Sequence, residues 1–346
     1  MSTLWGALAV GLAGLIVGGG AWPMKLMHKF QFEHWWFIGM LVGLVIMPWT
    51  ITLLFCPHAL DAYRSLAPGV LLRANAFAVA WGIANILCGL CFVRIGFALT
   101  GGILTGLGIS VGVAVPMLVK GSGLFSQAPD WDSPAGRTVL MGVAIILAAV
   151  LLVSLAGFGR DRALGKDNPS SSGGFLGGLV MAVIAGVLSA GISFAFVYSQ
   201  GPILEAMRAR GAGDIPANFA VWAAGLFGGA LINIFYPAYL MTKNKSWSIL
   251  AHSWREIALA VVIGINFIVG VALMGKGMLL LGALGASVGF GIQQAMQMLG
   301  SQGVGFISGE WRGVRGRPRN QMYLAIMVLV FATIVMAYGN TLQRRR

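Results

Sequence analysis

Residues 81–112 read WGIANILCGLCFVRIGFALTGGILTGLGISVG, two apolar runs that meet at Arg94. Each run is about as long as the 20 or so helical residues that cross a bilayer core. The stretch also contains the amide of Asn85 and seven glycines between Gly89 and Gly112. Lipid gives helices no hydrophobic reason to associate, so small residues hold them together by letting backbones approach closely. The pattern therefore predicts two tightly packed membrane helices with a polar group buried in one of them.

The whole chain has the composition of an integral membrane protein. Its 346 residues are 58% hydrophobic and only 10% charged, whereas soluble domains carry roughly a quarter charged residues. A single soluble core of this size would lack the polar residues needed to cover it. The apolar runs are also too long and continuous for the alternation of a β-barrel. We therefore predict an all-α integral membrane protein.

The net charge of +13 does not indicate a nucleic-acid partner. Basic residues lie in short clusters between apolar runs, for example at Lys243 and Lys245, and membrane proteins mark their cytoplasmic loops in this way. No cluster alternates with aromatic residues as a surface that binds single strands would. The lipid bilayer is therefore the predicted partner, and nucleic acid is not.

Ten apolar segments reach the length of a membrane helix. They are residues 2–22, 34–55, 74–93, 96–118, 138–158, 174–198, 217–241, 257–280, 285–308 and 321–339. A long polar connection divides these segments five and five. We predict a first five-helix repeat at 1–158, a cytoplasmic linker loop at 159–173 and a second five-helix repeat at 174–346. Two units of five helices face opposite ways across the membrane, which is the inverted-repeat architecture of many secondary transporters.

The charges of the loops predict the orientation. If the chain starts outside, the cytoplasmic loops hold 13 Lys and Arg residues and the opposite loops hold six. Positive charge is enriched in cytoplasmic loops, so both termini are predicted to be periplasmic. The cluster Arg344–Arg346 at the end of the chain argues for the opposite orientation.

The predicted membrane interior has no Asp or Glu near the centre of any span and no central Lys or Arg. Ionisable groups at that depth mark the paths of ions and charged substrates, so a charged cargo is disfavoured. The polar groups that remain are mainly amides. Amides both donate and accept hydrogen bonds, which suits a neutral polyhydroxyl solute such as a sugar. Trp35 and Trp36, near a predicted helix start, are assigned to the aromatic belt at the membrane interface.

The predicted substrate-binding residues are Trp22, Trp81, Asn85, Ser193, Asn233, Asn266, Gln293 and Gln297. The alternative for each amide is that it ties helices together, at about 0.6–2 kcal/mol per hydrogen bond. For Asn233 and Asn266 the two interpretations have equal weight. Gln293 and Gln297 are four residues apart and share one helix face. With Gln294 beside them, three amides in five residues favour binding.

Coupling to protons needs a group whose protonation can change with access. Glu33, at the start of the second predicted span, follows two phenylalanines, and burial among aromatic rings favours the protonated form of a carboxyl group. His34 titrates most easily near neutral pH. Glu33 and His34 are therefore the predicted proton-coupling residues. The alternative for Glu33 is a surface ion pair with Lys25 or Lys29.

Several short motifs are spread along the chain. They are Pro23-x-Lys25, Phe30-x-Phe32-Glu33 with Trp36, Pro48-Trp49, Trp81-Gly-Ile-x-Asn85, Arg94-x-Gly96, Gly136-Arg137, Ser189-Ala-Gly-x-Ser193-Phe, Asn233 and Glu310-Trp311. In their order along nearly the whole chain they resemble the L-rhamnose–proton symporter family, within the drug/metabolite transporter superfamily. The resemblance departs at residues 274–297, MGKGMLLLGALGASVGFGIQQAMQ, where family members are rich in aromatic residues and this chain has small and aliphatic ones.

The resemblance implies ten membrane helices and import of an L-rhamnose-like 6-deoxyhexose across a bacterial-type inner membrane. It also implies proton coupling, and it implies no enzyme activity or cofactor. The leading hypothesis is a proton symporter that works by alternating access, and no metal is expected. Trp81, Asn85 and Glu33 lie at matched positions. The chain also lacks a Ser/His/Asp constellation, a metal cluster and a phosphate loop. Two other functions stay open: a sugar or metabolite exporter or facilitator of the same superfamily, and a membrane sensor that transports nothing.

Overall fold

The computed structural model describes residues 2–94, 97–118, 130–165, 172–282 and 288–343, and every regular element in these ranges is a helix. The first half contains α1 (Ser2–Gly19), η1 (Trp22–Leu26), α2 (Phe32–Met40), η2 (Leu41–Ile46), α3 (Met47–Phe55), α4 (Ala59–Arg64), α5 (Pro68–Arg94), α6 (Phe97–Leu118) and α7 (Pro134–Ala163). The second half contains α8 (Ser172–Ser189), α9 (Gly191–Arg208), α10 (Asp214–Gly225), α11 (Phe227–Lys243), α12 (Ser248–Ala251), α13 (Trp254–Leu281), α14 (Phe290–Ile307) and α15 (Arg317–Gln343). The all-α class predicted from composition is therefore confirmed.

Seven helical segments in the described ranges are long and apolar enough to cross a membrane. The bent pair of α10 and α11 adds an eighth if it forms one crossing, and its two helices meet at 59°. The two other predicted spans, 96–118 and 285–308, fall on α6 and α14, which lie near residues outside the described ranges. The chain is thus a multi-pass membrane protein. Ten crossings as two inverted repeats, divided by the linker at 159–173, remain a prediction.

Local sequence explains where some helices begin and bend. α7 starts at Pro134, which has no N–H to leave unpaired, and its cap Ser133 accepts a hydrogen bond from a backbone N–H of the first turn (3.0 Å). At the α10–α11 bend, backbone groups lose helical partners where lipid cannot replace them. Asn75 of α5 pairs with both sides of this bend. Its Nδ2 donates to the carbonyl of Ala224 (3.0 Å), and its Oδ1 accepts from the N–H of Gly228 (2.7 Å).

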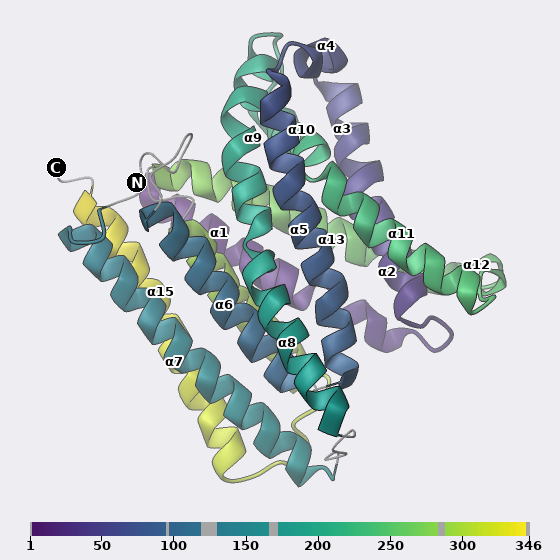
Figure 1. Ribbon diagram of the computed structural model, residues 1–346, viewed down its shortest axis with the longest axis vertical. Coiled ribbons are helices and arrows are strands. Elements are labelled where there is room, and N and C mark those ends of the chain that lie inside the picture. Colours follow the sequence, from purple (N-terminus) through teal and green to yellow (C-terminus); the bar gives the residue numbers. More distant parts are fainter. Residues whose placement is uncertain (1, 95–96, 119–129, 166–171, 283–287, 344–346) are drawn as a thin grey trace.

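Helices that are distant in the sequence pack side by side (Figure 1). α7 and α15 form an antiparallel pair along one edge, α1 packs against both α13 and α14, and α5 packs against α8, α9 and α11. Glycines permit some of these close contacts. A Cβ on Gly108 of α6 would overlap the hydroxyl of Ser189, and one on Gly112 would lie 2.5 Å from the ring of Phe290. These two glycines of the 81–112 stretch therefore serve close packing, as their spacing predicts.

Candidate substrate cavity

A cavity of about 210 Å³ lies among helices from both halves of the chain. α1, α2, α5 and α6 contribute from the first half, and the α8–α9 break, α13 and α14 contribute from the second. The lining residues are Val17, Gly20, Ala21, Trp35, Trp36, Met40, Trp81, Asn85, Leu104, Ser189, Ile192, Ile263, Phe267, Val271, Met274, Gln293, Gln294 and Gln297. None of these is charged, so a charged cargo would lose its water without gaining a counter-charge. Among the described residues, no three His, Cys, Asp or Glu side chains could together hold a metal ion.

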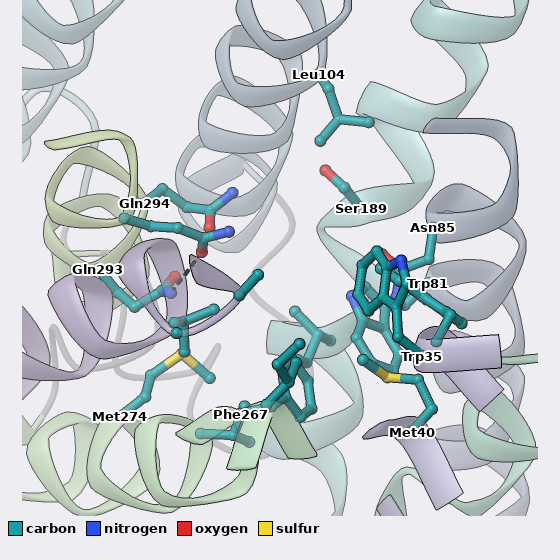
Figure 2. Close-up of a pocket in the computed structure, with 18 residues that line it drawn as sticks. Trp35, Met40, Trp81, Asn85, Leu104, Ser189, Phe267, Met274, Gln293 and Gln294 are labelled. Carbon is teal, nitrogen blue, oxygen red and sulfur yellow. Dashed lines mark hydrogen bonds between the residues drawn. The ribbon is translucent and has the colours of Figure 1, made fainter. Parts of the chain in front are cut away.

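Four of the eight predicted substrate-binding residues line this cavity. Trp81 and Asn85 come from α5, while Gln293 and Gln297 come from α14. Figure 2 shows Gln293 and Gln294 on one side and Asn85 with Trp81 on the other. Intramembrane amides from two distant parts of the sequence thus meet around one space. Their role as sugar ligands stays a prediction.

The other four predicted residues do not line the cavity. Nδ2 of Asn266 donates to the carbonyl of Gly20 (3.2 Å), which ties α13 to the chain that follows α1. Ser193 is fully buried on α9, and Trp22 is half exposed on η1. Asn233 is fully buried on α11. Asn233 and Asn266 therefore make the helix-tying contacts that are the alternative to direct binding.

Asn233 connects two lining residues from behind the cavity wall. Its Oδ1 accepts from Nε1 of Trp36 (3.0 Å) and from Nδ2 of Asn85 (3.4 Å). Its Nδ2 donates to the carbonyl of Gly229 (2.9 Å) within its own helix. Both ends of the Asn233 amide are thus engaged, and the residue joins α2, α5 and α11.

The glutamine wall depends on glycines of α1. Nε2 of Gln293 donates to Oε1 of Gln297 (2.8 Å). A Cβ on Gly14 would overlap the Gln293 carbonyl, and one on Gly18 would overlap the Gln297 carbonyl. Ser301 Oγ also donates to the carbonyl of Gly18 (3.1 Å). The backbones of α1 and α14 therefore touch at the two residues whose side chains line the cavity, and this contact sets how far those side chains reach into it.

Trp35 and Trp36 both line the cavity, which differs from their predicted place in the interfacial belt. The reason is that α2 turns the side that carries these residues toward the cavity. Trp36 and Met40 are one helical turn apart, share a helix face and both line the cavity. That spacing was the available signal, but a tryptophan near a helix start fits the interfacial belt equally well. On the opposite helix, Phe267 stacks on Trp81 (centroids 6.1 Å apart, planes at 18°) and extends the apolar surface.

Glu33 and His34 lie outside the cavity, buried in the first turn of α2. Oε1 of Glu33 accepts from Nδ2 of Asn244 (3.0 Å). Nδ1 of His34 accepts from the N–H of Gln31 (3.1 Å), so the proton of the neutral ring is on Nε2, which donates to Ser246 Oγ (3.0 Å). Both side chains thus connect α2 to the segment after α11. Among the described residues Glu33 has no cationic partner, so the ion pair with a lysine that was the alternative for Glu33 is not formed.

Two other carboxylates hold the connection between α1 and α2. Glu256, in the first turn of α13, accepts from the backbone N–H groups of residues 28–30 at 2.6–3.1 Å. Glu310 pairs with Lys25 and with Nη1 of Arg160 (3.0 Å). These contacts gather at the end of the bundle where α1, α7 and α14 terminate and α2, α13 and α15 begin. We call this region the charged end.

The sequence matches the family model of the L-rhamnose-proton symport protein (RhaT) over residues 4–342. The chain belongs to this family. The matched range includes every residue that lines the cavity and both carboxylates of the charged end. Membership in the L-rhamnose-proton symport family, predicted from scattered motifs, is therefore confirmed.

Individual relatives carry the same family name. The L-rhamnose-proton symporter of Yersinia pestis bv. Antiqua (strain Antiqua) is 32% identical over 229 residues, which are 66% of this chain and 65% of the relative. The L-rhamnose-proton symporter of Yersinia pseudotuberculosis serotype O:1b (strain IP 31758) is 32% identical over 229 residues, which are 66% of this chain and 64% of the relative. The matched stretch spans slightly less than two thirds of each relative's length. Both relatives are named as transporters, not as enzymes.

Proposed function

We propose that this protein is a secondary active transporter that imports a neutral sugar, an L-rhamnose-like 6-deoxyhexose, together with a proton. Its family supports proton-coupled sugar symport, and the Yersinia relatives are named for L-rhamnose and protons. The observation that carries the proposal is the cavity between the two halves of the chain, whose described lining has no charged side chain. Such a cavity suits an uncharged cargo.

The cavity walls match the two kinds of surface that a deoxy sugar presents. Amides of Asn85, Gln293, Gln294 and Gln297 offer donors and acceptors to hydroxyl groups. The ring of Trp81, with the aliphatic and methionine side chains around it, suits the C–H faces and the methyl group of the sugar. A buried amide left without a partner costs about 1–3 kcal/mol. Sugars that lack the matching hydroxyls should therefore bind poorly.

Glu33 and His34 are the proposed proton-coupling residues. Glu33 is buried with an amide, not a cation, as its partner. A carboxyl group that carries a proton donates as well as accepts hydrogen bonds. Because both side chains bond to residues 244–246, a proton on Glu33 would change the contacts between α2 and the segment after α11.

Alternating access requires the cavity to open to each side of the membrane in turn. Helices of both halves line the cavity, as expected if residues 1–158 and 174–346 are inverted repeats around a central site. The charged end would then form part of one barrier. We place the protein in a bacterial-type inner membrane with both termini periplasmic, because this orientation puts the positively charged loops inside.

Uptake of labelled L-rhamnose into proteoliposomes tests the proposal. An inward proton gradient should drive accumulation, and a pH dye inside the vesicles should report protons that enter with the sugar. Accumulation driven only by an outward-directed gradient would indicate an exporter. Flux that ignores the gradient would indicate a facilitator, and binding without any flux would indicate a sensor.

The Glu33→Gln variant isolates the coupling step. It should lose gradient-driven accumulation yet keep the exchange of labelled for unlabelled sugar, since exchange needs no net proton movement. Glu205→Gln is the matched control, because Glu205 is an exposed carboxylate near the end of α9 and should behave as wild type. Full accumulation by Glu33→Gln would remove Glu33 from coupling and leave the sugar site untouched.

A further inference from the structure

We infer that Asn233, which does not line the cavity, is a positioning residue that sets the hydrogen-bond polarity of the sugar site. It holds Asn85 so that the Asn85 side-chain carbonyl oxygen is the atom presented to the sugar. The inference rests on the proposed function and extends it: at this wall the cargo must offer a hydroxyl that donates.

The polarity begins with a donor that cannot be reversed. The indole Nε1–H of Trp36 can only donate, and its partner at 3.0 Å is Oδ1 of Asn233. Nδ2 of Asn233 then faces the carbonyl of Gly229 (2.9 Å), which can only accept. Turning the Asn233 amide over would set a donor against a donor and an acceptor against an acceptor. Its orientation is therefore fixed at both ends.

The orientation of Asn85 follows from that of Asn233. The Asn85 atom that lies 3.4 Å from Asn233 Oδ1 must be a donor, so it is Nδ2. Oδ1 of Asn85 accepts no hydrogen bond from the described residues. Asn85 is partly buried and lines the cavity. The second N–H of Nδ2 also has no partner among the described residues, but Oδ1 is the acceptor of this amide, and an acceptor without a donor is unfavourable in a site that excludes water.

The glutamine wall has no such constraint. One amide donates to the other across the Gln293–Gln297 contact (2.8 Å). Turning both amides over gives an equivalent bond in the opposite sense, because each amide can donate or accept. Gln294 has no hydrogen-bond partner among the described residues. The two walls therefore differ: the fixed Oδ1 of Asn85 demands a donor from the cargo, and the glutamine wall adapts to either kind of group.

Fluorinated sugars distinguish these two demands. Fluorine in place of a hydroxyl can accept weakly but cannot donate. At the sugar position that faces Asn85, fluorine should therefore be as poor as hydrogen, with an apparent affinity about tenfold or more below that of the hydroxyl. At positions that face the glutamine wall, fluorine should be tolerated better than hydrogen.

The test uses L-rhamnose analogues in which each hydroxyl is replaced in turn by fluorine or by hydrogen. The KM of uptake is compared among wild type, Asn233→Leu and Trp36→Phe. Wild type should show one position where fluorine and hydrogen are equally unfavourable. Asn233→Leu frees the Asn85 amide to turn, so the fluorine penalty at that position should fall below about threefold relative to L-rhamnose in the same variant. Trp36→Phe leaves the Asn233 amide held by the Gly229 carbonyl and should keep the penalty. Asn233→Ala, which removes the same amide, serves if Asn233→Leu does not fold.

Two results would overturn the inference: fluorine tolerated at every position in wild type, or an undiminished penalty in a folded variant that lacks the Asn233 amide. Hydrogen exchange at the Trp36 indole supplies a readout without any sugar. This N–H should exchange slowly in wild type and at least about tenfold faster in Asn233→Leu, with the 80% exposed Trp254 as the unprotected reference. Absent uptake of L-rhamnose by wild type would refute the proposed function, whereas rapid Trp36 exchange in wild type would refute the fixed polarity.

Discussion

The cavity and the charged end use opposite chemistry. The described cavity lining contains amides and no charged side chain. At the charged end, Glu256 and Glu310 hold the connection between α1 and α2 through carboxylate contacts. Each of these carboxylates already has partners within the protein, whereas Asn85 and Gln294 keep hydrogen-bonding capacity that nothing in the described chain uses. Charged side chains therefore connect segments of the chain at the charged end, and the described lining that would meet the proposed cargo has none.

Removing a cavity amide should have the largest effect on transport. Asn85→Ala and Gln297→Ala should each lower sugar uptake by at least about 100-fold, because hydroxyl groups of the sugar would be buried without partners. Uptake into proteoliposomes is the measurement, with size-exclusion profiles to show that folded protein remains. Gln302→Ala is the control on the same helix, since Gln302 does not line the cavity. Wild-type uptake in both cavity variants would remove these amides from the site.

The glutamine wall should be nearly as sensitive to a change on α1. A methyl group on Gly18 would overlap the Gln297 carbonyl, so α14 must shift. Overpacking of this kind costs about 1–3 kcal/mol, and we expect Gly18→Ala to reduce uptake by about 30-fold. Gly11→Ala on the same helix meets only Met296 at 3.8 Å and should stay within about twofold of wild type. Equal effects of the two alanines would mean that the α1–α14 contact does not set the position of the wall.

At the charged end, the buried carboxylate should matter more for stability than for transport. In Glu256→Gln a single side-chain oxygen must accept the hydrogen bonds that two oxygens now accept from the backbone N–H groups of residues 28–30. Hydrogen bonds to a charged group contribute about 1.5–3 kcal/mol, and the remaining oxygen keeps part of this. We expect a loss of about 1.5 kcal/mol in the free energy of unfolding, measured by denaturant titration in detergent. The KM for sugar should be unchanged, and a large rise in KM would contradict the separation of the two regions.

The smallest effect should come from the more exposed carboxylate. The Glu310 side chain is 40% exposed, and ion pairs near water contribute about 0–1 kcal/mol. Glu310→Gln should therefore lower the free energy of unfolding by less than about 1 kcal/mol. Because salt screens exposed charges, the difference from wild type should shrink further in about 1 M NaCl. A loss larger than that of Glu256→Gln would reverse the ranking of the two carboxylates.

Some cavity residues could be predicted from the sequence because polar side chains are unusual at that depth in the membrane. Asn85 and Gln297 could be predicted because an amide in an apolar helix needs a partner. The all-α class could be predicted from the composition and from the length of the apolar runs. The family could be predicted because its motifs are spread in order along the chain, although no single motif is specific.

Other features of the site depend on which helices pack against each other, and one sequence alone does not reveal that packing. From the sequence alone, Trp36 is predicted to lie at the membrane interface. In the structure α11 packs against α2, and Asn233 accepts a hydrogen bond from Trp36. Asn233 and Asn266 have the same chemistry as Asn85, and only the tertiary contacts separate helix-tying amides from those that line the cavity. The partner of Lys25 lies 285 residues away at Glu310, beyond any local pattern.

α5 is one continuous helix, and it carries both Asn75 and Asn85. The two residues are ten positions apart, or about 15 Å along the axis. Asn75 forms hydrogen bonds with the backbone on both sides of the α10–α11 bend, while Asn85 lines the cavity. A rotation of α5 that turned Asn85 relative to the cavity would also pull Asn75 away from the bend. The orientation of Asn85 and the angle between α10 and α11 are thus coupled through one continuous helix.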